Sequence, residues 1–408
     1  MQDELGAVTG GVDTHADQHV AAVVDGIGRI LATSAFATTE AGYRALARWM
    51  GSFGPLRRVG VEGTGSYGAG LARYLVAQGI EVVEVNRPNR QARRRRGKSD
   101  TTDAEAAARA ALNGEASGVP KAADGPVEAL RALRVARRSA LRAHTQASNQ
   151  VRDLIVTAPG DLRAKFGGLE ADRLLAACAR LRPGSPTDPA EATKTALRHL
   201  GRRCQNLAAE IAELDRDITA LCAQINPGLL GAFGVGPDTA SALLVAAGDN
   251  PGRMRSEASF AALCGSSPVE ASSGKIVRHR LNQGGNRTAN NALWRIVMGR
   301  RRHGHRPTVE YFERRRAEGK TDREITRCLK RHVAREVYRL MVQPPATVSG
   351  AELRAARQGA DIPLRVVAEA LGTWPTRISQ LERGLIHSSD LAARYRLWLD
   401  QAVGRKAA

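Results

Sequence analysis

The chain has 408 residues, 43% of them hydrophobic, and its 61 Lys and Arg residues exceed its 41 Asp and Glu residues to give a net charge of +20. This composition excludes a fibrous or wholly disordered protein, and the charge favours a nucleic acid as partner over an anionic membrane surface. No apolar run reaches the ~18 residues of a membrane span, and no signal peptide is evident, so we expect a cytoplasmic location. The five cysteines lack C-x-x-C spacing, which predicts reduced and mostly buried thiols.

Strand and helix patterns alternate along the first 113 residues. Residues 7–36 predict three strands, with "DGIG" as a hairpin-like break between the second and the third. A helix, a strand, a second helix, a short strand and a third helix follow, and the last helix runs from Ser99 to about Asn113. Three consecutive strands followed by βα alternation predict a mixed sheet flanked by helices.

After Pro126 the pattern is helical, with breaks at the loops "TAPGD" and "RPGSPTDPA". Apolar residues then recur in steps of four and three, which is typical of the seam of a coiled coil. This seam requires a partner helix, and the sequence leaves open whether that helix belongs to the same chain or to a second copy. The seam consists of Leu200, Cys204, Leu207, Ile211, Leu214, Ile218, Leu221 and Ile225.

Two segments beyond the seam have the composition of phosphate-binding loops. In "LLGAFGVGPDTASALLVAAGD" (229–249), Gly-Val-Gly separates two helical stretches, as in a helix-hairpin-helix motif, although an ordinary helical turn explains it equally well. The next segment, which includes "SSGKIVRHRLNQGGNR", is rich in Ser, Gly, Asn and Arg. Residues 342–350 then have the Pro, Ser and Gly content of a linker.

The C-terminal segment "ELRAARQGADIPLRVVAEALGTWPTRISQLERG" resembles the helix-turn-helix domain of Cro and phage repressors. Its second and third helices would flank a turn at Gly372. A three-helix appendage without a DNA-reading role is the alternative. In the DNA-binding interpretation, the start of the last helix presents Thr376, Arg377, Ser379 and Gln380 to the major groove.

Four carboxylates occupy separate segments that the predicted sheet would bring together. Asp13 lies in the first strand, Glu62 ends or follows the fourth, and Asp100 and Asp103 lie at the start of a helix. Asp100 would by itself suit a helix cap. Four converging acids repel one another unless divalent cations relieve the repulsion, and oxygen ligands favour Mg²⁺ or Mn²⁺. A basic run before the helix would guide a phosphate backbone towards the metal, and it consists of Arg93, Arg94, Arg95 and Arg96.

The order of these carboxylates on the predicted strands and helix resembles the ribonuclease H superfamily and, more narrowly, its RuvC-like branch. The motifs "GVDTHAD", "VEGTGSY", "KSDTTDA", "GVGPDTASALL", "SSGK" and "NQGGNRTANNAL" together resemble the IS110 family of insertion-sequence transposases. This resemblance implies a RuvC-like DEDD domain, a helical dimerisation region and a C-terminal transposase domain with a nucleophilic serine. Some members of the family are guided by a structured RNA encoded by their own element.

The resemblance assigns Asp13, Glu62, Asp100 and Asp103 as metal ligands and Ser273 as the nucleophile. Ser272, Ser266 and Ser267 are the competing hydroxyls nearby. Because the acids and the serine lie in separate domains, the complete site is expected to form when protomers assemble. The residues expected to balance phosphate charge are Lys275, Arg278 and Arg280.

The expected fold is a multidomain α/β plus α protein. Its parts would be a RuvC-like mixed sheet at 1–120, a helical coiled-coil region at 126–226, a mostly helical transposase domain at 227–342 and a helix-turn-helix at 350–403. The appended helix-turn-helix departs from the family pattern. We predict a Mg²⁺-dependent DNA transposase and recombinase, dimeric or tetrameric, in the bacterial cytoplasm and on the nucleoid when bound to DNA. A structure-selective RuvC-like nuclease and a DNA-binding regulator derived from a transposase are the alternatives.

Overall fold

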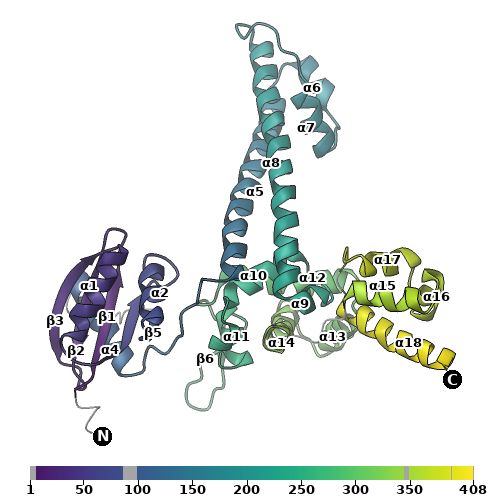
Figure 1. Ribbon diagram of the computed structural model, residues 1–408. Coiled ribbons are helices and arrows are strands. Elements are labelled where there is room, and N and C mark those ends of the chain that lie inside the picture. Colours follow the sequence, from purple (N-terminus) through teal and green to yellow (C-terminus); the bar gives the residue numbers. More distant parts are fainter. Residues whose placement is uncertain (1–5, 86–98, 344–348, 387, 408) are drawn as a thin grey trace. The chain divides into compact units, whose positions relative to one another are not determined.

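The computed structural model describes residues 6–85, 99–343, 349–386 and 388–407 (Figure 1). The chain forms two compact units. The sheet unit consists of Met1–Gly125 and Ala247–Arg255, and the helical unit consists of Pro126–Ala246 and Ser256–Ala408. Across the described residues, no helix combines the length and the apolar character that crossing a bilayer requires.

A mixed five-stranded sheet organises the sheet unit, in the order β3-β2-β1-β4-β5. The first three strands pair antiparallel, whereas β1–β4 and β4–β5 pair parallel, so the predicted mixed sheet is confirmed. The elements of this unit are β1 (Val8–Thr14), β2 (Gln18–Val24), β3 (Ile30–Ala37), α1 (Glu40–Gly51), β4 (Leu56–Glu62), α2 (Ala69–Ala77), β5 (Glu81–Val85), α4 (Asp100–Leu112) and a 3₁₀ turn at Pro251–Arg253.

The two faces of the sheet carry different helices. Val12 and Val61 are fully buried on one face, in a core cluster that includes Met50 of α1 and Leu75 of α2. On the opposite face, α4 crosses β1, β2 and β4. The sheet, purple in Figure 1, is therefore the middle of three layers, with α1 and α2 on one face and α4 on the other.

Two glycines allow α4 to lie directly on the central strands. A Cβ atom added at Gly11 of β1 would lie 2.1 Å from the backbone nitrogen of Ala108, and one added at Gly60 of β4 would lie 2.6 Å from the carbonyl oxygen of Ala107. Both atoms belong to the α4 backbone, which cannot rotate away as a side chain can. The strands therefore need glycine at both positions.

Gly11→Ala is expected to destabilise the sheet unit by roughly 1–3 kcal/mol or more, because overpacking forces backbone shifts. The same shift would move the first turn of α4 away from β1. Urea denaturation measures the loss of stability. Gly65→Ala is the matched control, since a Cβ added there meets no atom within 4 Å. Equal stability of the two variants would contradict the close contact.

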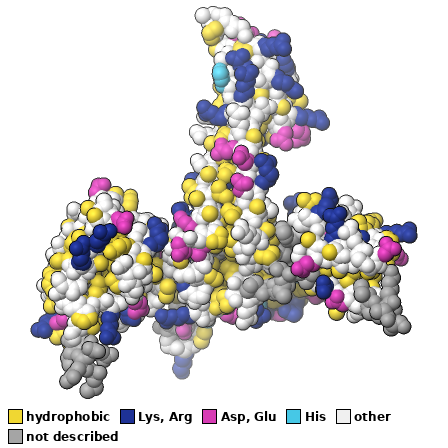
Figure 2. All heavy atoms as spheres, viewed as in Figure 1, with side chains coloured by type: hydrophobic (Ala, Val, Ile, Leu, Met, Phe, Trp, Pro, Cys, Tyr) yellow, Lys and Arg dark blue, Asp and Glu magenta, His cyan; other side chains and the backbone are white. Residues whose placement is uncertain are grey.

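Two long helices, α5 (Pro126–Val156) and α8 (Pro189–Ile225), lie side by side in the helical unit (Figure 1). The predicted seam therefore has a partner in the same chain. Cys204 and Ile218 are buried, whereas other seam residues are only half-buried. On α5, Val135 is 59% exposed, and Figure 2 shows hydrophobic side chains along the face of this pair that is in view. Two short helices pack near the far end of the pair, α6 (Gly160–Phe166) and α7 (Ala171–Ala179).

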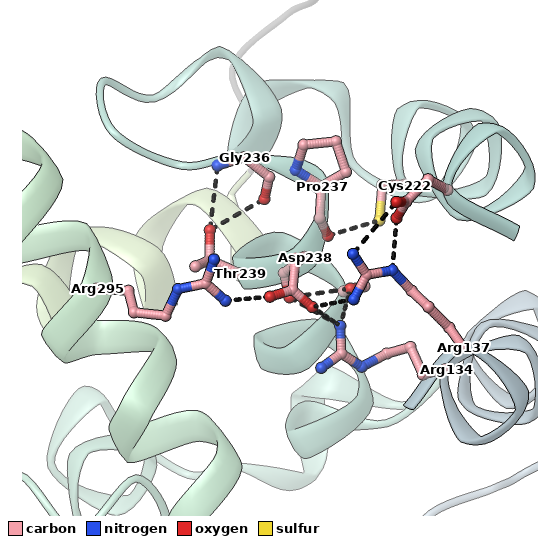
Figure 3. A network of polar contacts seen from close by, with 10 residues as sticks. Arg134, Arg137, Cys222, Gly236, Pro237, Asp238, Thr239 and Arg295 are labelled. Carbon is pink, nitrogen blue, oxygen red and sulfur yellow. Dashed lines mark hydrogen bonds and ion pairs between the residues drawn. The ribbon is translucent and has the colours of Figure 1, made fainter. Parts of the chain in front are cut away.

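A polar network ties α10 (Pro237–Ala247) to the long pair and to α12 (Arg287–Arg302) (Figure 3). Asp238, in the first turn of α10, forms ion pairs with Arg134 and Arg137 of α5 and with Arg295 of α12. Burial alone would raise the pKa of Asp238, but the guanidinium groups of Arg295, Arg134 and Arg137 outweigh it and hold this pKa below its ordinary value. Arg137 also binds Asp215 of α8 at 2.5 Å.

The remaining elements follow the long pair along the chain in two groups, at residues 227–342 and 350–407. The linker assigned to residues 342–350 comes between the groups, and its positions 344–348 lie outside the described residues. Four of the five cysteines are buried and Cys328 is partly buried, so the prediction that the thiols are mostly buried is confirmed. The elements are α9 (Pro227–Gly231), α10 (Pro237–Ala247), α11 (Glu257–Leu263), β6 (Val269–Glu270), β7 (His279–Arg280), α12 (Arg287–Arg302), α13 (Arg306–Ala317), α14 (Asp322–Val342), α15 (Gly350–Gly359), α16 (Leu364–Ala370), α17 (Pro375–Glu382) and α18 (Ser389–Ala407).

The last four helices, α15 to α18, enclose a core of their own. A buried ion pair crosses this core, in which Arg357 of α15 donates to both carboxylate oxygens of Glu382 at 2.7 and 2.9 Å. The Tyr395 hydroxyl donates to the same carboxylate at 2.7 Å, so the buried charges have partners. The three helices predicted for this segment are present as α15, α16 and α17, and α18 contributes a fourth helix to the same core.

Candidate active site

Asp13 and Glu62 lie at the ends of two neighbouring parallel strands. Side chains alternate along a strand, so Asp13 faces the same side of the sheet as Gly11, and Glu62 the same side as Gly60. That side carries α4. Val12 pairs with Val61, and the Thr14 hydroxyl donates to the Glu62 carbonyl oxygen at 2.9 Å. The register thus places the two acids at adjacent positions on the sheet face that carries α4.

Asp100 and Asp103 lie in the first turn of α4. Ser99 caps this helix, because its hydroxyl accepts the backbone N–H of Thr102 at 3.2 Å. The alternative role of Asp100 as the helix cap is therefore wrong. Asp103 is buried, whereas the Asp100 side chain is 50% exposed. The first turn of a helix is favourable for both acids because its free N–H groups carry partial positive charge.

The structure brings Asp13 and Asp100 together with His15, which follows β1. Each offers a ligand atom, and these atoms lie within 4.8 Å of one another. The His15 Nε2 atom is 3.2 Å from Asp13 Oδ2 and 3.5 Å from Asp100 Oδ1. Two carboxylates and an imidazole at this separation are a suitable donor set for a divalent metal ion.

The electrostatics of Asp13 agree with a cluster of acids. Burial raises the pKa of Asp13 above its ordinary value, and the nearby Asp103 and Asp100 carboxylates raise it further, although His15 opposes them. Asp103 therefore acts on Asp13 even though it is not one of the three closest groups. A bound cation would favour the ionised form and relieve this repulsion.

Sequence reasoning selected the four acids and missed His15. The signal was present in "VDTH", because residues two apart on a strand face the same side and His15 is two residues beyond Asp13. The predicted arginines at positions 93–96 lie outside the described residues.

Ser273 lies at the tip of the hairpin formed by β6 and β7. Its backbone N–H donates to the carbonyl oxygen of Ile276 at 3.1 Å, and Ile276 returns the same bond at 3.1 Å. Gly274 has φ of 57°, the left-handed conformation that glycine adopts without strain. Every residue from 271 to 280 is exposed, including Lys275, Arg278 and Arg280.

The four candidate hydroxyls differ in their hydrogen bonds. Ser272 Oγ accepts from the Arg278 N–H at 3.1 Å, and Ser266 Oγ donates to the Ala261 carbonyl oxygen at 3.0 Å. Within the described part of the chain, the hydroxyls of Ser273 and Ser267 have no such partner. Ser267 is half-buried, so Ser273 carries the exposed free hydroxyl.

The four residues predicted to read DNA lie on α17. Thr376 and Arg377 are exposed, and Ser379 and Gln380 are half-buried. Trp374, which is 79% exposed, directly precedes α17 at its N-cap position.

Two family models match the sequence. The model of the IS110 DEDD transposase domain, described as "Transposase", matches residues 10–158 and so includes all four acids. A second model, described as "Transposase IS116/IS110/IS902 family", matches residues 229–313 and includes the serine hairpin. No curated protein matches the chain. The two ranges follow each other in the order expected from the motifs and together span more than half of the sequence, and the chain therefore belongs to the IS110 family of transposases, enzymes that act on DNA.

Proposed function

We propose that this transposase is a serine recombinase that cuts and rejoins the DNA ends of an insertion sequence. The observation that carries the proposal is the convergence of Asp13 and Asp100 at the junction of β1 and α4, within a region that matches a DEDD transposase model. Asp103 and Glu62 complete the proposed ligand set. Among the described residues, Asp13 and Asp100 form ion pairs with His15 and not with an Arg or Lys residue, so a structural salt bridge to such a cation does not explain why the two acids lie together.

The proposed metal is Mg²⁺ or Mn²⁺, because carboxylate oxygens dominate the ligand set. Such an ion, when bound, would supply Lewis-acid activation of a phosphate oxygen and neutralise developing charge. The residues of this chain hold the carboxylates in place. Gly11 and Gly60 let α4 approach, Ser99 begins the helix, and His15 lies between two of the acids.

Ser273 is the proposed nucleophile. Its Oγ atom would form a bond to phosphorus as the hydroxyl proton is lost, and the bond from phosphorus to the deoxyribose oxygen would break, with that oxygen leaving with the electron pair and taking up a proton. Rejoining reverses these steps with a different deoxyribose hydroxyl. The exposed hydroxyl and the neighbouring cations Lys275, Arg278 and Arg280 support this assignment, because they suit contact with a phosphate.

The C-terminal helices are proposed to form a helix-turn-helix that selects DNA sequence. Deletion of residues 350–408 is expected to leave strand exchange on short supplied ends intact and to reduce sequence-selective binding, because base contacts from Thr376, Arg377 and Gln380 are lost. Electrophoretic mobility shifts with specific and scrambled duplexes measure this. Equal selectivity of the truncated and full chains would make the four helices a passive appendage.

A structured RNA from the same element is the proposed guide, and the protein is proposed to act as a dimer or tetramer. The half-buried seam of α8 and the exposed apolar residues of α5, such as Val135 and Leu141, support an additional contact along the long pair. The division into four domains and the cytoplasmic location stay predictions.

A strand-transfer assay tests the proposed function. Purified protein is incubated with the ends of its element and a target duplex, with and without Mg²⁺, and with and without RNA transcribed from those ends. We expect joined products that require Mg²⁺ and a covalent protein–DNA intermediate. Cleavage without joining and without an intermediate would contradict the proposal and favour a RuvC-like nuclease.

A further inference from the structure

A cleft of about 970 Å³ opens beside the hairpin that carries Ser273. Its wall includes the loop after α11, strand β7, and residues from α12, α13 and α14. The volume lies at the upper end of the ~300–1,000 Å³ typical of sites that enclose small ligands. It is sufficient for a few nucleotides.

The cleft is basic. Five cationic side chains line it, and among the described lining residues there is no Asp or Glu. The Nη2 atom of Arg331 pairs with Glu257 Oε1 at 3.3 Å, whereas its buried Nη1 atom has no hydrogen-bond partner in the described part of the chain. Lys330 donates to the Asn290 side-chain oxygen at 2.9 Å, which fixes the position of its charge. The five cations are Arg280, Arg287, Arg327, Lys330 and Arg331.

The cleft also offers aromatic faces and amide groups. Trp294 of α12 lines it and is 46% exposed, although most tryptophan surface in a folded chain is covered. Tyr311 and His332 meet edge to face there, with ring centroids 5.6 Å apart. The side-chain amide of Asn291 provides both a donor and an acceptor, whereas that of Asn282 donates to the Ala262 carbonyl oxygen and accepts from the Gly284 N–H.

We propose that this cleft binds unpaired nucleotides of a single strand, with phosphates on the cations and a base stacked on Trp294. Cations alone would suit a duplex equally well, but a duplex hides the faces of its bases, whereas an unpaired base can stack on an exposed aromatic ring. The inference rests on the proposed recombinase function and specifies its substrate. Since Arg280 belongs both to β7 and to the cleft, a strand held there lies at the base of the Ser273 hairpin.

Binding is measured with labelled 12-nucleotide single strands of DNA and RNA and with a 12-base-pair DNA duplex, in EDTA so that no cleavage occurs. Trp294→Ala is expected to weaken single-strand binding by about 5- to 150-fold, the effect of losing one stacked base, and to leave duplex binding within about twofold. Trp294→Phe should retain most of the affinity. If Trp294→Ala loses affinity for only one of the two single strands, DNA or RNA, that strand is the one that the cleft binds.

Charge and position have separate tests. Arg327→Gln is expected to lower the salt dependence of single-strand binding by about 0.7 in the log–log slope, as for one lost phosphate contact, whereas Arg216→Gln on the exposed surface of α8 should not. A strand that carries 5-iododeoxyuridine should photo-crosslink to the tryptic peptide 288–295, which contains Trp294.

Unchanged single-strand affinity in Trp294→Ala, equal losses for single strand and duplex, or crosslinks only to other peptides would each overturn the inference. Circular dichroism of each variant shows that the helices are intact. These measurements do not involve the Ser273 hydroxyl or a metal, so failure of the inference is distinguishable from failure of the proposed recombination chemistry.

Discussion

Asp100→Ala is expected to reduce DNA cleavage by about 100-fold or more, and Asp103→Ala to do the same. Charge stabilisation by a catalytic metal amounts to several kcal/mol, and each ~1.4 kcal/mol corresponds to a factor of ten in rate. Asp100 is half exposed and lies 3.5 Å from His15, so its removal leaves no cavity in the core. Cleavage of a labelled element end in Mg²⁺ measures the rate.

Metal binding gives this prediction a second readout. Mn²⁺ at 100 times its Kd should stabilise the wild-type protein by about 2.7 kcal/mol in thermal denaturation, and Asp100→Ala should lose that gain. Without metal, the variant should be as stable as the wild type or more so, because one carboxylate of a repelling cluster is gone. Glu105→Ala, on the same helix, is the matched control, since Glu105 pairs with Arg109 at 3.6 Å. Wild-type cleavage by Asp100→Ala would refute the metal site.

Ser273→Ala is expected to abolish the covalent protein–DNA adduct and recombination while leaving DNA binding intact. No other hydroxyl can replace a nucleophile whose Oγ forms the bond to phosphorus. The residue is exposed at the hairpin tip, and the backbone bonds between Ser273 and Ile276 do not involve its side chain. Adduct formation is measured by denaturing electrophoresis with radiolabelled DNA.

Ser272→Ala is the control for this prediction. It removes the neighbouring hydroxyl, which already bonds to the Arg278 backbone at 3.1 Å, and should retain much of the activity. Ser267→Ala tests the one other candidate hydroxyl without a partner among the described residues, and it too should remain active. An adduct that persists in Ser273→Ala and disappears in Ser272→Ala would reverse the assignment.

Much of the sheet unit could be predicted because its signals are local. The alternating strands lie where the residue pattern favours them, but α4 is capped by Ser99 and not by Asp100, the residue that the sequence had suggested. The grouping of Asp13 with Asp100 followed from topology, since neighbouring parallel strands end at one edge and a helix that packs on them begins there. Gly11 and Gly60 add the physical reason for the close contact, which the sequence pattern alone did not reveal.

The rest depends on tertiary contacts. The strands β6 and β7 have two residues each, too few for a periodic pattern, so the serine segment was expected only as a loop. The cleft joins Trp294, Tyr311 and Arg327 from three helices, and no local pattern shows that their side chains line one cavity. The partner of the α8 seam was undecidable for the same reason, because α5 and α8 are separated by α6 and α7.

Mass-spectrometric mapping of the covalent intermediate tests whether Ser273 is the nucleophile. The adduct trapped on a nicked element end in Mg²⁺ is digested with protease and nuclease, and the nucleotide-bearing peptide is sequenced. We expect a nucleotide on Ser273, in an adduct that Asp100→Ala fails to form. A nucleotide on any other residue, or strand transfer that proceeds with no adduct at all, would contradict the role of Ser273 as nucleophile.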